Sequence, residues 1–277
     1  NDANKDGFIN ASEKGADVTA KITLVSGAAV GDVITLAAGT VSSSITLTAA
    51  DVANGFVNAS FPNPVEGGAI NVSATSRDLA GNVSMPVTTG SVRLDTTAPG
   101  APAIGAASDN MGPVQGPLAS GGVTDDTTPT LTGSGATAGD VIKVYDNGSA
   151  IGSTTVKADG SWSFTPARPL AEGAHRLTTT AIDPAGNESR PSAAFTVNVD
   201  TTPPAALDAS SIQVLDDIGA VRGPIAAGAQ TDDSKPEYIG KTDPAQVSSI
   251  NVYDNGKLIG STAVNADGSW RFTPALP

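Results

Sequence analysis

The sequence predicts an all-β protein made of three tandem β-sandwich repeats in an extended rod. Three observations support this prediction. Several motifs recur in the same order at a spacing of 105 to 108 residues. Short apolar runs alternate with turn residues. The composition, with 31 Gly, 19 Pro and 4% aromatic residues, suits short strands and many turns better than long helices. This spacing divides the 277 residues into three domains of ordinary size.

The repeat can be read from paired motifs. The loop at 78–82 matches the loop at 183–187, which brings the first segment into the same set of repeats. The predicted domains are residues 1–95, 96–200 and 201–277. We expect the first to lack its first strand and the third to lack its last strands. The other matching pairs are 94–99 with 199–204, 125–126 with 232–233, 144–148 with 252–256, 158–162 with 266–270 and 164–167 with 272–275.

Within the middle repeat, the alternation of apolar residues predicts seven short strands. Ile142 and Val144 alternate before Asn147-Gly148, which is a strong hairpin signal because both residues tolerate positive φ. Five other strands are expected around Leu131, Val156, Trp162 with Phe164, Leu177 with Thr179 and Ala181, and Phe195 with Val197 and Val199. Seven short strands in about 100 residues predict an immunoglobulin-like sandwich, here without its cysteine pair.

The charge of the chain restricts its partners. The net charge is −13, which argues against nucleic acid or an anionic membrane as a partner. No apolar run approaches the length of a membrane span, so this segment is not expected to insert into a membrane. Of the 28 acidic residues, 23 are Asp, a turn residue and a cation ligand. Since the chain has no cysteine, a metal ion is the natural way to stabilise small domains outside a cell.

The sharpest local motif is the segment 2–13, which matches D-x-[DN]-x-[DN]-G-x5-E at every specified position. In such a loop three side chains face one centre, a glycine permits the bend, a backbone carbonyl adds an oxygen and a glutamate closes the sphere. The predicted calcium ligands are Asp2, Asn4, Asp6, the carbonyl of Phe8, and Glu13. The alternative is an ordinary Asp, Asn and Gly turn that binds nothing.

Aspartates also gather where repeats join. The strand order predicts Asp183 at the N-terminal end of the middle repeat and an acidic group at its C-terminal end, where mutual repulsion favours a divalent cation. The alternative is that each Asp accepts backbone hydrogen bonds and fixes a turn. Asp95 is predicted to meet Asp183 across the first junction, and Asp78 to do the same for a preceding unit. The acidic groups are Asp109, Asp125, Asp126 and Asp200 in the middle repeat, and Asp216, Asp217, Asp232 and Asp233 in the third.

No residue pattern indicates catalysis. His175 is the only histidine and is expected to be a solvated strand residue. Trp162 and Trp270 occupy equivalent positions beside phenylalanines, which indicates core packing more than sugar binding. The segment 133–135 lacks the strand-to-helix setting of a nucleophile elbow or a phosphate loop. We therefore expect no enzymatic activity.

The motifs at 95–99, 183–187, 145–148 and 158–162 resemble the bacterial Ig-like repeats of giant adhesins secreted by type I systems and of biofilm-associated proteins. The resemblance covers essentially the whole chain and is most specific over 95–277. It implies a secreted stalk at the bacterial cell surface, stiffened by calcium at its junctions so that it projects a distal tip. The implied partners are neighbouring repeats and, through other regions, a host-cell or biofilm ligand.

Two alternatives to a stalk remain open. The repeats could themselves bind a glycan or receptor, for which exposed aromatic side chains are expected. The chain could also be an accessory β domain of a secreted polysaccharide enzyme, whose catalytic domain would lie elsewhere in the parent protein.

Overall fold

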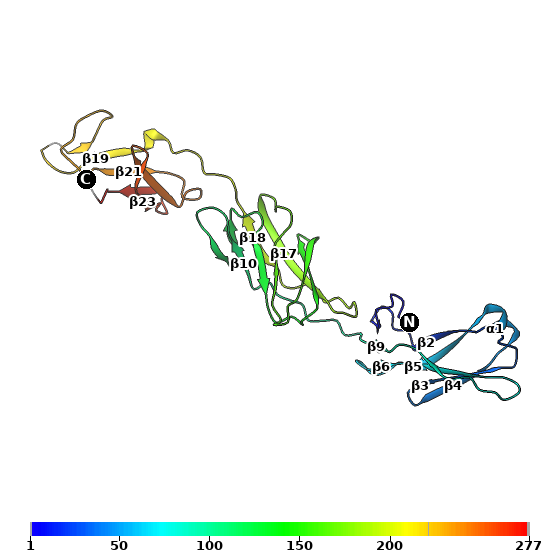
Figure 1. The fold of residues 1–277 in the computed structure, drawn as a ribbon. Coiled ribbons are helices and arrows are strands. Elements are labelled where there is room, and N and C mark those ends of the chain that lie inside the picture. The colour runs from blue at the N-terminus through cyan, green and yellow to red at the C-terminus, as the bar shows by residue number, and fades with distance from the viewer. Residues whose placement is uncertain (1, 221, 276–277) are drawn as a thin grey trace. The chain divides into compact units, whose positions relative to one another are not determined.

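The computed structural model describes residues 2–220 and 222–275, and it is nearly all-β. It divides into two compact units, the first ending at Thr201 and the second beginning at Thr202. The first unit contains two repeats with separate hydrophobic cores, coloured blue to cyan and green in Figure 1. Only two short helices occur among the described residues, α1 (Ala49–Asn54) and the 3-10 helix η1 (Ala209–Ser211). No described helix is long and apolar enough to cross a membrane.

The middle repeat is a sandwich of two sheets. One sheet has the order β11-β10-β13-β16 and the other has the order β12-β18-β17-β14-β15. Neighbouring strands are antiparallel except β12 and β18, which run parallel with Thr124 beside Val199. The strands are β10 (Ala106–Asp109), β11 (Gly116–Leu118), β12 (Gly122–Thr124), β13 (Thr130–Gly133), β14 (Val141–Asp146), β15 (Ser149–Thr155), β16 (Trp162–Phe164), β17 (Gly173–Ile182) and β18 (Phe195–Val199).

The prediction of seven strands in this repeat is wrong, because the structure has nine. The chain reverses after β10 to pair as β11, and then crosses to the second sheet as β12. Gly112, Gly116 and Gly121 have φ of 62°, 134° and 93°, which allow these closely spaced changes of direction. Apolar alternation does not reveal β11 (Gly-Pro-Leu) and β12 (Gly-Val-Thr), because each contains a single large apolar residue, whereas Trp162 and Phe164 mark the equally short β16.

The core of the middle repeat lies between the two sheets. Leu131, Ile142 and Leu177 are completely buried. Trp162 is 1% exposed and packs against Gly133, where an added Cβ would come within 2.5 Å of the indole ring. Trp270 of the third repeat packs in the same way against a glycine and is also buried. The prediction that both tryptophans are core residues is confirmed.

The first repeat uses the same plan with shorter pieces of sheet. Its sheets have the orders β4-β3-β7-β8, β2-β5 and β1-β9-β6. β1 runs parallel to β9 with Ile9 beside Leu94, as β12 runs beside β18 in the middle repeat. Among its described residues, no strand corresponds to β10 or β11. The strands are β1 (Phe8–Ile9), β2 (Asp17–Thr23), β3 (Val33–Ala38), β4 (Val41–Thr46), β5 (Phe56–Pro62), β6 (Ala69–Ile70), β7 (Ser73–Arg77), β8 (Val87–Thr88) and β9 (Val92–Leu94).

The third repeat, taken by itself, reproduces part of the middle one. Its sheet β20-β19-β21-β24 corresponds to β11-β10-β13-β16, and its hairpin β22-β23 corresponds to β14-β15. Both hairpins turn at an Asn with φ of 47°. In both, the strand register shifts between a Val and the Tyr that follows it, at Val144 and Val252. In the described part of this unit, no strand corresponds to β12, β17 or β18. The strands are β19 (Gln213–Asp216), β20 (Gly223–Pro224), β21 (Glu237–Lys241), β22 (Ser249–Asp254), β23 (Lys257–Ala263) and β24 (Ser269–Phe272).

Candidate metal centres at the repeat junctions

Residues 2–13 form a loop that is closed by its own side chains. Asp2 accepts hydrogen bonds from the backbone N–H of Asp6 on Oδ1 and of Gly7 on Oδ2, both at 3.1 Å. Asn4 Oδ1 also accepts from the Asp6 N–H, at 3.0 Å. Lys5 and Gly7 have φ of 63° and 90°, so the backbone curls around these side chains. The first half of the motif thus forms a single tight turn.

Glu13 closes the loop from its other end. Its Oε1 accepts from the Ala3 N–H at 3.0 Å, and its Oε2 accepts from the Asn10 N–H at 3.3 Å. The predicted ligand side chains Asp2, Asn4, Asp6 and Glu13 therefore share one loop, and Phe8 continues it into β1. Carboxylate and amide oxygens are the donors that calcium prefers. In the described part of the chain, however, no three His, Asp or Glu side chains lie close enough together to hold a metal ion.

The loop is connected directly to the first repeat junction through Asn10. Asn10 is 8% exposed, and its Oδ1 accepts from the backbone N–H groups of Ser12 and Glu13 at 2.9 and 3.1 Å. Its Nδ2 donates to the carbonyl of Ala185, in the middle repeat, at 2.9 Å. One side chain thus ties the end of the loop to the neighbouring repeat.

Asn187 makes the matching contacts from the middle repeat. Its Oδ1 accepts from the Ala11 N–H at 2.9 Å. Its Nδ2 donates to the carbonyl oxygen of Asp95 and to Asp183 Oδ2, both at 2.9 Å. Asp95 and Asp183, which we predicted to meet at this junction, are therefore bridged by an uncharged amide. The sequence did not identify Asn187 as a junction residue. The available signal was the Gly-Asn pair that ends its loop and recurs at residues 81–82.

A third carboxylate, Asp140, lies at this end of the middle repeat and was missed. Asp140 is 1% exposed, and neither of its carboxylate oxygens has a hydrogen-bond partner. Burial raises the pKa of the Asp140 carboxyl, and the nearby Asp183 carboxylate raises it further. The residue directly follows Gly139 and precedes β14, a setting that indicates an ordinary turn. Only the packing around it shows that its charge is uncompensated.

The linkers after the first two repeats are held by glutamates. Glu66 Oε1 accepts from the Thr96 N–H at 2.6 Å, and Glu66 Oε2 accepts from the Thr96 hydroxyl at 2.8 Å. These bonds, the amide first and the hydroxyl second, lower the pKa of Glu66. In the middle repeat, Glu172 Oε2 accepts from the amide and hydroxyl of Thr201 at 3.0 and 2.7 Å. Each glutamate thereby holds the first threonine of its linker against its own repeat.

Comparison with known proteins agrees with this fold. Residues 107–201 match the family model described as the bacterial Ig-like domain. These residues form a bacterial Ig-like domain. No curated protein matches the sequence at a significant level.

Several solved structures resemble the chain. One is that of a 1.5-MDa bacterial ice-binding adhesin, with 21% identity over 98% of this chain and 84% of that chain, at a TM-score of 0.35. A tetra-tandem repeat from the extending region of a large adhesion protein has 19% identity over 96% and 65%, at 0.30. Fibronectin(III)-like modules of Clostridium thermocellum CbhA have 17% identity over 70% and 88%, at 0.40. All three TM-scores are below 0.5, so these structures do not show how the domains of this chain are arranged.

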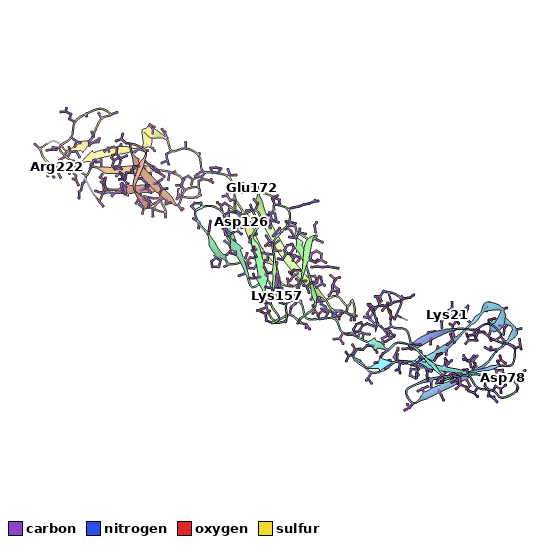
Figure 2. The ribbon with its side chains drawn as sticks, viewed as in Figure 1. Lys21, Asp78, Asp126, Lys157, Glu172 and Arg222 are labelled. Atoms are coloured by element: carbon purple, nitrogen blue, oxygen red, sulfur yellow. The ribbon has the colours of Figure 1, made fainter. Side chains whose placement is uncertain are left out.

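The opposite end of the bacterial Ig-like domain carries the predicted acidic group. Asp109 Oδ1 accepts from the Met111 N–H at 2.9 Å, and its Oδ2 accepts from the Thr124 hydroxyl at 2.6 Å. Asp126 is completely buried and accepts from the backbone N–H groups of residues 110 and 128. The Asp200 N–H donates to the Thr124 carbonyl, which brings it to this end as predicted. Figure 2 shows Asp126 and Glu172 at one end of the domain and Lys157 at the other.

The third repeat repeats these contacts residue by residue. Asp216 accepts from the Ile218 N–H at 3.1 Å and from the Thr231 hydroxyl at 2.7 Å, and Asp233 accepts from the Lys235 N–H at 2.7 Å. The other acidic residues of these groups, Asp125, Asp217 and Asp232, are exposed. Asp125 packs on Gly112 and Asp232 packs on Gly219. In both repeats the two buried aspartates act as turn-forming acceptors, the alternative that the sequence left open.

The loop at 78–82 has the same internal hydrogen bonds as the loop at 183–187 at the first junction, but it contacts no neighbouring repeat among the described residues. Asp78 Oδ1 accepts from the Asn82 N–H and Oδ2 from its Nδ2, both at 2.8 Å, as Asp183 does with Asn187. The side-chain bond first and the backbone bond second lower the pKa of Asp78. Asp78 is exposed, and it lies at the end of the first repeat away from β9 (Figures 1 and 2).

The prediction for His175 is wrong. The ring is 6% exposed and lies in the bacterial Ig-like domain between Asp146 Oδ2 and the carbonyl of Ala171, each 2.8 Å from one ring nitrogen. An acceptor therefore lies within hydrogen-bonding distance of each ring nitrogen, and the polar ring is buried near the start of β17 with partners beside it. The pairing of β14 with β17, which brings Asp146 alongside, supplies one of these acceptors.

Proposed function

We propose that this chain is a non-enzymatic stalk segment of an adhesin exported to the bacterial cell surface, with calcium stiffening the junctions between its Ig-like repeats. The coarse features behind this proposal are the tandem repeats and the bacterial Ig-like domain at 107–201. A stalk needs junctions that resist bending. The proposal therefore depends on what holds the first junction.

The observation that supports calcium best is the burial of Asp140 without hydrogen-bond partners. A buried carboxylate without hydrogen-bond donors costs several kcal/mol unless a cation or a proton compensates its charge. Asp140 lies near Asp183, whose carboxylate raises the cost further. A cation held by Asp140 and Asp183 would neutralise both. The Asp95 carbonyl, bridged to Asp183 by Asn187, would lie beside it.

Calcium suits these donors better than magnesium does. The candidate ligands are carboxylate and carbonyl oxygens from separate loops, and calcium accepts six to eight such oxygens with variable geometry. Magnesium keeps most of its water and requires a nearly ideal octahedron. Calcium would bind the loop at 2–13 by the same chemistry. Since Glu13 and Asn10 connect that loop to Ala185, both sites would stiffen the same junction.

The burial of both tryptophans weakens the alternative of a glycan-binding module. Trp162 and Trp270 are 1% and 3% exposed, so neither offers a flat surface for sugar stacking.

The test compares the wild-type chain with Asp140→Asn and Asp159→Asn. Asp159 is an exposed turn residue of the same repeat, and its replacement removes the same charge. We expect calcium to stabilise the wild type by about 2.7 kcal/mol at a hundredfold excess over the dissociation constant. Asp159→Asn should retain this gain, and Asp140→Asn should lose the part that comes from the junction. Equal calcium responses of all three proteins in calorimetric titration and thermal unfolding would rule out the Asp140 site.

A further inference from the structure

The two contacts of the His175 ring define its protonation state. Nδ1 lies 2.8 Å from Asp146 Oδ2, and Nε2 lies 2.8 Å from the carbonyl oxygen of Ala171. An ionised carboxylate and a carbonyl only accept hydrogen bonds, whereas a neutral imidazole has one N–H and one acceptor nitrogen. In a neutral ring one nitrogen lone pair would therefore face an oxygen lone pair. The imidazolium, with a proton on each nitrogen, satisfies both contacts.

The surroundings of the ring preserve this charge pair. The side chains of His175 and Asp146 are 6% and 16% exposed, so dissolved salt screens their attraction poorly. The other oxygen of Asp146, Oδ1, is buried and has no hydrogen-bond partner. Among the residues that the structure describes, His175 is thus the one cationic group that pairs with this carboxylate.

The remaining charged neighbours of the ring lie on the surface. Arg168 lines the same cavity as His175 but is exposed, and Glu172 and Arg176 on either side in the sequence are also exposed. The neighbouring residues from β15 and β18, Ile151 and Val197, carry no charge.

The first repeat shows that this place in the fold does not require a polar residue. There Ile70 pairs with Val92, as His175 pairs with Val197 one repeat later. Ile70 is partly buried and packs against the apolar cluster that contains Ile9. Replacing a buried ion pair by apolar residues of similar size is often neutral or stabilising. The charged pair of the middle repeat therefore needs an explanation other than stability.

The second contact of the ring lies beside the residue that holds the next linker. Ala171, whose carbonyl faces His175 Nε2, directly precedes Glu172. Glu172 Oε2 accepts from both the amide and the hydroxyl of Thr201. On the other side of Ala171, the Leu170 N–H donates to the Thr127 carbonyl at 2.7 Å. The position of Glu172 therefore depends on the bond between His175 and Ala171.

From these contacts we infer that His175 is a proton-dependent latch: as an imidazolium it holds Ala171 and keeps Glu172 bound to Thr201, and loss of one ring proton weakens that binding. Histidine is the side chain that changes charge in the physiological pH range. The start of the second linker is thus held more firmly at neutral and acidic pH than at alkaline pH. The latch needs no metal ion, so it is independent of the proposed calcium sites.

Nitrogen NMR of the full chain in calcium-depleted buffer tests the protonation state directly. His175 is the only histidine, so its ring signals need no assignment. At pH 7 we expect a proton on each ring nitrogen and the nitrogen shifts of an imidazolium. Asp146→Asn removes the negative charge beside the ring, and this variant should lose the second ring proton at a lower pH than the wild type does. A wild-type ring with a single proton at pH 7 would overturn the inference.

The chain supplies its own control for the effect on the linker. Glu66 accepts from the amide and hydroxyl of Thr96 as Glu172 does from those of Thr201, but the first repeat has Ile70 in place of the histidine. We expect the hydrogen-exchange rate of the Thr201 N–H, divided by that of the Thr96 N–H, to rise about fivefold from about pH 6 to about pH 9, as the loss of about one hydrogen bond implies. The division removes the base catalysis that both amides share.

His175→Ile separates the latch from simple packing, because it gives the middle repeat the residue of the first. The ratio of the two exchange rates should not change with pH in this variant. A constant ratio in the wild type, or an equal rise in His175→Ile, would overturn the inference. The wild-type measurements decide the question even if this variant fails to fold.

Discussion

At the residue scale, Asp140 differs from every other aspartate at the junctions. Asp95, Asp109, Asp126 and Asp183 all accept hydrogen bonds from nearby amides or hydroxyls. Asp140 accepts none on its side chain and is buried. Its ionised form therefore destabilises the folded protein unless a cation is present.

The pH dependence of stability follows from the raised pKa of Asp140. The folded protein binds the proton of this carboxyl more tightly than the unfolded chain does, so in calcium-depleted buffer this group favours folding more as pH falls toward the unfolded value of about 3.9. Asp140→Asn lacks the charge at every pH. We expect the variant to be more stable than the wild type at neutral pH, with a difference that shrinks on acidification.

Denaturant titrations of both proteins at several pH values measure this difference. Other carboxyl groups, such as Asp78 and Glu66, have lowered pKa values and act in the opposite direction, but they are common to both proteins and cancel. A variant less stable than the wild type at neutral pH would contradict the account.

The loop at 2–13 makes a separate prediction at the residue scale. Asp6→Ala with Glu13→Ala removes two predicted ligands and the closing contacts to Ala3 and Asn10. The number of calcium ions bound per chain should fall by one in equilibrium dialysis. Asp159→Asn with Asp267→Asn removes the same charge from two exposed turns and should leave the number unchanged. An unaltered stoichiometry in the first variant would show that the loop is an ordinary turn.

At the scale of elements, the loops at 78–82 and 183–187 form a matched pair. Both have the same internal Asp to Asn hydrogen bonds, but only Asn187 also reaches Ala11 and Asp95. Comparing the two asparagines therefore separates the cost of breaking a loop from the cost of breaking a junction.

Asn187→Ala should loosen the first junction. The Ala11 N–H loses its acceptor, and with about 1 kcal/mol for one hydrogen bond its hydrogen exchange should accelerate about fivefold. Asn82→Ala disrupts the equivalent loop without touching this contact, so exchange at Ala11 should not change. If both variants exchange at the wild-type rate, the bond to Asn187 does not hold the junction.

The sequence predicted the structural features that are set by residues adjacent in the chain, such as turns. The Asn147-Gly148 turn is an example, because the required positive φ is a property of those two residues. It did not predict what depends on distant packing. His175 is buried because β14 brings Asp146 beside it, and Asp140 is buried by surroundings that a Gly-Asp turn does not indicate. The bridge by Asn187 spans 92 residues to Asp95 and follows from no local pattern.

At the scale of the whole molecule, the stalk proposal requires that calcium change how far the chain extends. Asn10 and Asn187 already hold the first junction by uncharged hydrogen bonds, each exchangeable with water and worth about 1 kcal/mol. Such bonds alone allow the junction to open often. A cation shared by Asp140 and Asp183 would add a contact that water replaces poorly.

Small-angle scattering of the full chain with millimolar calcium, and then with chelator, tests this requirement. We expect the maximum dimension to be larger and its distribution narrower with calcium, because a stiff junction samples fewer bent arrangements. Asp140→Asn in calcium should scatter like the wild type in chelator, whereas Asp159→Asn should follow the wild type in both conditions. If scattering by the wild type does not respond to calcium although titration shows that the ion binds, then calcium stabilises individual repeats and does not stiffen the junctions between them.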